Sequence, residues 1–201
     1  MLTIRWSRGD GRLLEGILWV AFAVEAVFGL LLPALGVVGV IASGGSRTVA
    51  VDRASVIAGT PTARGVSLTG TDKAELTFHH PGVTERILLA LPDALVATLS
   101  LLVIVLLIRM SRTLRTGDPF AAANVRRLSM IAVAIVLAGL LAPSAEAITT
   151  QLLVRSSPVA ERIPFQFTVP FLPIVLGMLV AALAEVFRRG TGLRDDTEGL
   201  V

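Results

Sequence analysis

The chain has 201 residues, of which 54% are hydrophobic and 16% charged. Its mean hydropathy of +0.79 is too high for an ordinary water-soluble domain. A formal charge of +3 would suit a nucleic-acid partner, but the arginines stand beside hydrophobic runs, where they set membrane topology and meet anionic lipid. Cysteine is absent, which excludes disulfides, thiolate metal sites and cysteine nucleophiles. We therefore expect an integral membrane protein that does not bind nucleic acid directly.

The first membrane-spanning helix is predicted over residues 13–41, after a basic N-terminal segment. The apolar run is far longer than the roughly 7–15 residues of a signal-peptide core, so we expect it to be retained in the mature protein. Pro33 is expected to kink this helix. Small surfaces for a neighbouring helix are expected at Gly29, Gly36 and Gly39.

Residues 43–87 are polar and are predicted to form a small β-rich insertion outside the cytoplasm. About three strands are expected because short alternating pieces are separated by turn signals. These pieces cover residues 48–51, 65–68 and 74–78. Because three strands bury little core, the insertion must pack against the membrane helices or against a partner. His79 and His80 are adjacent on an expected strand and would point to opposite faces, which argues against a shared metal ion.

Two further spans are predicted over residues 88–109 and 128–153, joined by a short turn rich in arginine. The turn carries Arg109, Arg112, Arg115, Arg126 and Arg127. Short loops rich in basic residues stay in the cytoplasm, so this turn fixes the orientation of the whole chain. Anionic lipid headgroups are its expected partners. Pro92 is expected in the first turn of its helix, where a missing N–H costs little.

A candidate interaction motif lies within this turn. Asp118 followed by Pro119 is a helix start, since the carboxylate accepts from free N–H groups and proline suits the first helical position. Phe120 is expected to dip into the membrane. With Arg126 and Arg127, these residues form either a helix entry that contacts lipid phosphates or a docking surface for a cytosolic protein.

The fourth span is predicted over residues 169–187 and follows an extended approach over residues 163–170, whose two prolines are six residues apart. Glu185 lies three and four residues before Arg188 and Arg189, so the three side chains share one face and should pair near the inner interface. Gly190 is expected to cap the helix. Four spans place both termini in the cytoplasm.

Three acidic residues within the spans form a candidate intramembrane polar site: Glu25, Asp93 and Glu146. An ionised side chain at mid-membrane costs about 2.5–3.5 kcal/mol on insertion scales, so these groups should face the bundle and be paired or protonated. The outer arginines available to Asp93 and Glu146 are Arg86, Arg155 and Arg162. Two interpretations compete, namely satisfied polar groups that fix helix register, or the lining of a cavity for a proton, a cation or a small ligand. A catalytic pair is the remaining alternative.

A small and polar stripe on the third span supports helix packing on the side that holds Glu146. Its members recur at alternating threes and fours: Ser129, Ala132, Val136, Gly139, Pro143, Glu146 and Thr150. No metalloprotease, nucleophile-elbow or phosphate-loop motif occurs in the sequence. We therefore predict no catalytic residue, no cofactor and no metal site.

Three short motifs carry a resemblance to a known family. They are GDPF at residues 117–120, NVRRL at 124–128 and LAEVFRRG at 183–190. With these motifs the whole chain resembles the bacterial membrane family catalogued as domain of unknown function 2975. The resemblance implies a four-helix inner-membrane protein, often encoded beside a small helix-turn-helix regulator. It implies no catalytic residues.

The sequence thus predicts one polytopic domain over residues 1–201, an all-α bundle of four transmembrane helices with a small extracytoplasmic β-rich insertion. For its function we favour a non-enzymatic regulatory or accessory protein of the bacterial cytoplasmic membrane, acting with a protein partner. The rival is a small transporter or permease subunit that uses Glu25, Asp93 and Glu146. A third possibility is a homo-oligomer or a building subunit of a larger complex, which the glycines of the first span favour.

Overall fold

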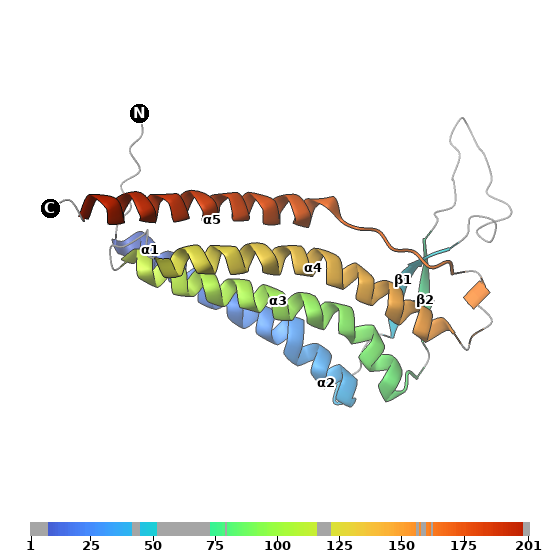
Figure 1. Cartoon of the computed structure of the whole chain (residues 1–201). Helices are drawn as coiled ribbons and strands as arrows, with labels where there is room; N and C mark the ends of the chain where they lie inside the picture. The colour runs from blue at the N-terminus through green and yellow to red at the C-terminus, as the bar shows by residue number, and fades with distance from the viewer. Residues whose placement is uncertain are drawn as a thin grey trace, which may run out of the picture. The chain divides into compact units, whose positions relative to one another are not determined.

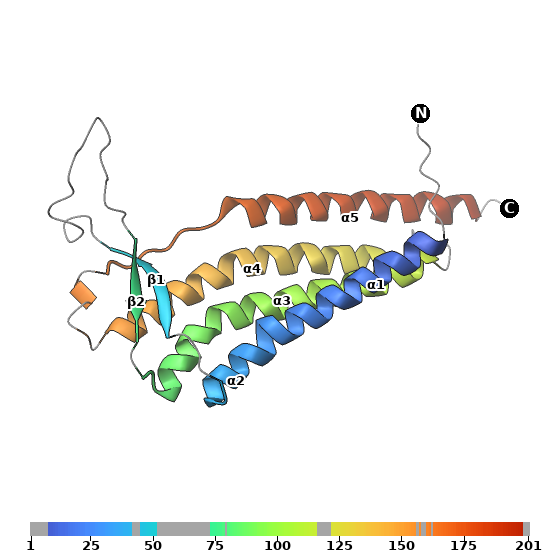
Figure 2. The same ribbon diagram turned by 180° about the vertical axis from the view of Figure 1, so that it is seen from behind.

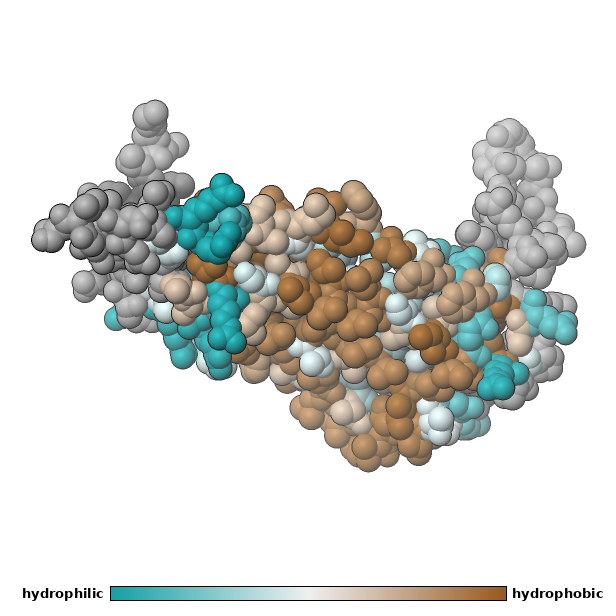
Figure 3. Space-filling model, viewed as in Figure 1, coloured by the Kyte–Doolittle hydropathy of each residue, from teal (hydrophilic) through white to brown (hydrophobic). Residues whose placement is uncertain are grey.

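The computed structural model describes residues 8–41, 45–51, 73–78, 80–115, 122–155, 157, 160–161 and 163–198. Within these ranges four helical stretches are long and apolar enough to cross a membrane: Gly11–Val38, Val83–Thr113, Ala122–Val154 and Phe171–Thr191. Apolar side chains dominate the visible face of the helices (Figure 3). Many of them are exposed, as expected where lipid replaces water around a bundle. The protein is therefore a multi-pass membrane protein.

The first span is made of three consecutive helical segments. Helix α1 covers Arg8–Val24, a π-helical segment η1 covers Glu25–Leu31, and α2 covers Leu32–Val38. The Leu32 N–H donates to the Val27 carbonyl, five residues back. Proline removes one backbone donor and crowds the carbonyl four residues earlier, and π turns accommodate such disruptions. The π segment ends two residues before Pro33, and the predicted kink at Pro33 stays a prediction.

Helix α2 ends in a Schellman motif. The Gly39 N–H donates to the Gly36 carbonyl at 3.1 Å, and the Val40 N–H donates to the Leu35 carbonyl at 3.0 Å. Gly39 has φ +83°, in the left-handed region that this motif requires and glycine adopts at little cost. The helix therefore stops here for a local reason.

Helix α3 covers Val83–Arg115 and begins before the predicted span. The Gly82 N–H donates to Glu85 Oε2 at 2.6 Å, one half of a capping box, and the Arg86 N–H donates to the Gly82 carbonyl. Pro92 therefore lies inside the helix and not in its first turn as predicted. Its missing N–H leaves the carbonyl of Leu88, four residues earlier, without a helical partner.

Helix α4 covers Ala122–Val154 and α5 covers Phe171–Glu198. At 1.5 Å per residue, the 33 residues of α3 or of α4 span about 50 Å. The hydrocarbon core of a bilayer is only ~30 Å thick, so both helices extend beyond it. Helix α5 continues through Gly190, which is therefore not the predicted helix cap.

Two antiparallel strands form the described part of the insertion. Strand β1 covers Ser46–Ala50 and β2 covers Lys73–Thr77, in a register that pairs Arg47 with Leu76 and Val49 with Ala74. Both lie within one residue or two of the predicted pieces. The expected third piece, residues 65–68, lies outside the described residues. The expected extended approach is present over residues 164–170, which have no helix or strand structure.

The chain divides into two compact units. Unit 1 comprises Met1–Leu32, Asp93–Ala142 and Val169–Val201, and unit 2 comprises Pro33–Pro92 and Pro143–Thr168. Each passage of the chain from one unit to the other occurs at or next to a proline. The prolines concerned are Pro33, Pro92, Pro143 and Pro170.

The small core of unit 2 joins the strands to the end of α4. Val49, Val154 and Ile163 are buried, and Leu76 and Ala160 pack against them. Both ribbon views show the strands beside the C-terminal part of α4 (Figures 1 and 2). The two-stranded sheet thus packs against a membrane helix, as predicted for an insertion with so few strands.

In unit 1, α4 and α5 approach closely at two glycines. A Cβ atom added at Gly139 would lie 2.6 Å from Pro173 Cβ, and one added at Gly177 would contact the Val136 side chain and come within 3.1 Å of the Ala132 carbonyl. Three members of the predicted stripe, Ala132, Val136 and Gly139, therefore form the seam against α5. Small residues at such seams let backbones pack tightly in membranes.

We expect Gly177→Ala to lower the free energy of unfolding by about 1–3 kcal/mol, because the added methyl group overpacks this seam. Gly16→Ala on α1 is the matched control, since no atom lies within 4 Å of the added Cβ. The control should be neutral or should stabilise by up to ~1 kcal/mol through helix propensity. Thermal unfolding of both variants in the same detergent measures the difference; equal melting temperatures would contradict the tight seam.

Candidate functional site

A single arginine joins three elements of unit 2. Arg47 on β1 donates from Nη1 to Thr149 Oγ1 at 2.7 Å and to Thr150 Oγ1 at 3.1 Å, both on α4. Its Nη2 donates to the carbonyls of Leu88 at 3.0 Å and Leu89 at 2.9 Å on α3. The guanidinium therefore ties the strand to both helices.

The position of this guanidinium follows from two local features. Side chains alternate along a strand, so Arg47 shares a face with the buried Val49. Pro92 frees the Leu88 carbonyl, which needs a donor from elsewhere. Arg47 supplies that donor, much as polar partners satisfy proline-freed backbone groups in other membrane helices.

A cavity of about 190 Å³ lies beside this joint, within unit 2. Its lining is contributed by β1, by the C-terminal part of α4 and by the extended segment. The polar members of the lining are Thr48, Glu146, Thr150, Gln151, Gln166 and Thr168. Glu146 is exposed and, among the described residues, its carboxylate has no hydrogen bond or ion pair. The expected ion pairs from Arg86 and Arg155 to Glu146 are not formed, and Arg162 lies outside the described residues.

The extended segment forms one wall of the cavity and alternates along its length. Pro164, Gln166 and Thr168 line the cavity. Between them, Phe165 is 62% exposed and Phe167 is 46% exposed. Because successive side chains of an extended chain point to opposite sides, the wall has a polar inner face and an apolar outer face. It does not pair with the strands, since the described sheet contains β1 and β2 alone.

The other two predicted acids belong to unit 1. Glu25 is half-buried at the start of η1, and its Oε1 lies 3.3 Å from the position of a Cβ built on Gly29. Gly29 itself approaches Ala97 of α3 closely, as predicted for a packing glycine. Asp93 is exposed. Neither acid lines the cavity that contains Glu146.

A polar clasp joins α3 to α4 at the arginine-rich end of unit 1. Asn124 is fully buried, and its Oδ1 lies 2.9 Å from Arg127 Nη1 and 2.7 Å from Thr113 Oγ1. Arg127 Nη1 also donates to the Arg109 carbonyl at 3.0 Å. The clasp, which we define as Thr113, Asn124 and Arg127, therefore satisfies backbone and side-chain groups at the end of α3. Arg126, the preceding residue, is exposed.

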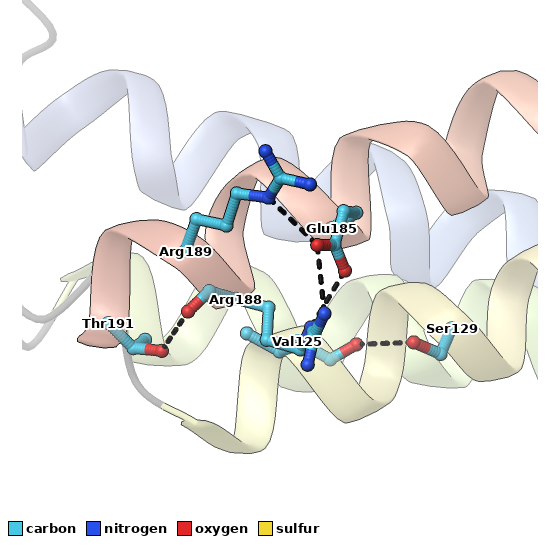
Figure 4. A network of polar contacts seen from close by, with 6 residues as sticks. All are labelled: Val125, Ser129, Glu185, Arg188, Arg189 and Thr191. Atoms are coloured by element: carbon cyan, nitrogen blue, oxygen red, sulfur yellow. Dashed lines mark hydrogen bonds and ion pairs between the residues drawn. The ribbon is translucent and has the colours of Figure 1, made fainter. Parts of the chain in front are cut away.

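Two ion-pair groups complete this end of unit 1. Arg112 Nε lies 2.9 Å from Glu15 Oε1, which joins α3 to α1. On α5, Glu185 pairs with Arg188 Nε at 2.7 Å and with Arg189 Nε at 2.9 Å, as Figure 4 shows. The predicted pairing of Glu185 with both arginines is confirmed. Exposed pairs contribute little to stability, so the cluster mainly neutralises a carboxylate near the end of the apolar span Phe171–Thr191.

Sequence reasoning did not identify Arg47, Asn124 or Glu15 as structural groups. For Arg47 the available signal was its alternation with Val49. The predicted motif residues Asp118, Pro119 and Phe120 lie outside the described residues and stay predictions. No group of three or more histidine, aspartate or glutamate side chains in the described ranges is placed to hold a metal ion.

Comparison with known proteins gives one result. No curated protein and no solved structure matches the chain. Residues 74–201 match a family described as "Protein of unknown function (DUF2975)". This match covers β2 from Ala74 on, the clasp, Glu146 and the Glu185 cluster. It confirms the resemblance carried by the GDPF, NVRRL and LAEVFRRG motifs, but it does not extend over residues 1–73. The chain belongs to the DUF2975 family.

Proposed function

We propose that the protein is a non-enzymatic regulatory or accessory component of the bacterial cytoplasmic membrane. Unit 2 lies on the outer side and receives a ligand or a partner, and the arginine-rich end of α3 and α4 lies in the cytoplasm with both termini. The basic turn supports this orientation, because arginine in short loops is retained inside. The same arginines meet anionic lipid headgroups.

The observation that carries the proposal is that α4 contributes to both polar sites. Asn124 and Arg127 belong to the clasp, and Glu146 and Thr150 line the cavity. A component that reports an outer event to an inner partner needs such a site at each end of one helix. A cytosolic protein is the expected inner partner, and the family resemblance makes a helix-turn-helix regulator a candidate by analogy.

The structure suggests which arginine is available to that partner. Arg127 donates within the clasp, whereas Arg126 is exposed and has no bond to a described residue. We expect a photo-crosslinking side chain at position 126 to form a reproducible adduct with one cytosolic protein in intact cells. The same probe at Val133, an exposed apolar position of α4, is the control and should give no adduct with that protein.

Absence of any protein adduct at position 126, together with a homo-oligomer that travels alone through gentle-detergent purification, would overturn this function. The favoured function would then be transport. The observation that favours transport is the π segment at Glu25, because π turns occur often at functional sites. Transport would be lost in Glu25→Gln with folding unchanged, whereas an accessory role tolerates that substitution.

A further inference from the structure

We propose that the cavity of unit 2 binds a primary ammonium group, presented either by a free amine or by a lipid headgroup. This proposal deepens the proposed function, because it names the chemical class of the ligand that the outer unit receives. The carrying observation is that a single carboxylate, Glu146, lines one cavity together with five residues whose side chains carry neutral oxygens: Thr48, Thr150, Gln151, Gln166 and Thr168.

The charge of the lining selects a cation. Glu146 is the one charged residue among the described residues that line the cavity. The remaining polar groups are hydroxyls and amides, whose oxygens accept hydrogen bonds. An ammonium group has three donors and no acceptor, so it matches a carboxylate accompanied by neutral oxygens. Charge-assisted bonds of this kind are the stronger ones.

Neighbouring contacts orient two of the acceptors. Gln151 Nε2 donates to the Ile163 carbonyl at 3.3 Å, so the amide oxygen of Gln151 is the atom left to accept. Thr150 Oγ1 accepts from Arg47 Nη1 and retains a second lone pair. The Arg47 charge behind Thr150 disfavours a second cation nearby. Binding should therefore be of modest affinity and should depend strongly on Glu146.

The composition and size of the cavity argue for an organic cation and against a divalent metal ion. Calcium takes 6–8 oxygen ligands and usually several carboxylates, whereas this lining offers one. At ~30 Å³ per water molecule, 190 Å³ corresponds to roughly six waters. A small amine with its hydrocarbon stem fits that space better than a bare ion.

The wall of the cavity explains why a lipid headgroup is one of the two sources. Its outer face carries the exposed Phe165 and Phe167, whose apolar rings favour contact with lipid over contact with water. Its inner face carries Gln166 and Thr168. An aminophospholipid beside the wall would place its ammonium group within reach of the cavity, and a free amine would enter from water.

The test uses the full chain in lipid nanodiscs of phosphatidylcholine and phosphatidylglycerol, which contain no primary amine. Ethanolamine and choline are titrated by calorimetry, because both carry one positive charge and only ethanolamine has N–H donors. A second arm replaces phosphatidylcholine with phosphatidylethanolamine and measures the melting temperature. The variants are Glu146→Gln and Thr168→Val in the lining, with Glu75→Gln as control, since Glu75 is an exposed carboxylate on β2 outside the lining.

We expect ethanolamine to bind more tightly than choline, and Glu146→Gln to weaken it about tenfold or more. Thr168→Val should weaken it about threefold through loss of one neutral acceptor, and Glu75→Gln should bind as the wild type does. A rise in melting temperature with phosphatidylethanolamine alone, lost in Glu146→Gln, assigns the site to the lipid headgroup. Equal binding of choline, equal behaviour of Glu146→Gln, or no response in either arm overturns the ammonium site.

The nanodisc assay contains no partner protein, so its result is independent of the crosslinking result. A failed ammonium site with an intact adduct at position 126 leaves the accessory role in place with a different ligand. A confirmed ammonium site, without any protein adduct and with a homo-oligomer that purifies alone, removes the accessory role instead.

Discussion

Replacing Arg47 with methionine should destabilise unit 2 by about 3 kcal/mol, because it removes a cationic donor from two hydroxyls and two carbonyls at once. The largest loss is expected at the Leu88 carbonyl, which would have no hydrogen-bond donor because Pro92 has no N–H. Arg47→Lys should recover only part of the loss, because a single ammonium nitrogen does not reach both helices as a guanidinium fork does. Amide exchange of residues 46–50 and 73–77 reports the loss directly.

A double-mutant cycle separates this mechanism from a general loss of packing. Pro92→Ala restores an N–H that can bond the Leu88 carbonyl within α3, so Arg47→Met should cost less in that background. Arg155→Met, at an exposed position after α4, is the control and should change stability by less than ~0.5 kcal/mol. Additive effects of the substitutions at 47 and 92 would show that the proline-freed carbonyl is irrelevant.

Asn124→Leu is expected to destabilise the clasp by about 1–3 kcal/mol. The substitution removes the acceptor for Arg127 Nη1 and Thr113 Oγ1 in a fully buried position, and buried donors without partners are costly. Asn124→Asp keeps an acceptor toward Arg127 and should retain most of the stability. The measurement is the free energy of unfolding in mixed micelles.

The control for the clasp is Ser129→Ala, one turn further along α4. Ser129 is exposed and bonds only to the Val125 carbonyl of its own helix among the described residues, so its loss should be nearly silent. If Asn124→Leu is as silent as Ser129→Ala, the clasp does not hold α3 to α4. If Asn124→Asp is as damaging as Asn124→Leu, the shape of the amide matters more than its acceptor.

The four apolar helices were predictable because membrane spans follow from length and hydropathy alone. Their ends were less predictable, since the helices run beyond the apolar runs for local reasons. Helix α3 begins at Val83 because Glu85 caps it, and that signal lies in a polar stretch that hydropathy ignores. The strands were placed within two residues because alternation has a short period that is visible in the sequence.

The contacts that build the site were harder to predict. Arg47 lies in a polar insertion, where the sequence gives no reason to distinguish it from other surface charges. Its hydrogen-bond partners are more than 40 residues away in sequence. Only the combination of an inward-facing strand position with a proline-freed carbonyl reveals its role. Glu146 was identified as a candidate from its place in a span, but the neutral oxygens around it come from three elements that sequence spacing does not connect.

The place of Arg47 in the chain also sets an order of assembly. The ribosome makes β1 before either of the two helices that Arg47 contacts. The α3 carbonyls follow Arg47 by 41 and 42 residues, and the α4 hydroxyls follow it by 102 and 103 residues. While α3 enters the membrane, Arg47 is already available to cover its exposed carbonyl. Unit 2 is completed only after α4 has been synthesised, because distant contacts form late. A chain made only as far as α3 therefore lacks the α4 half of this joint and leaves Val49 without Val154, its neighbour in the small core.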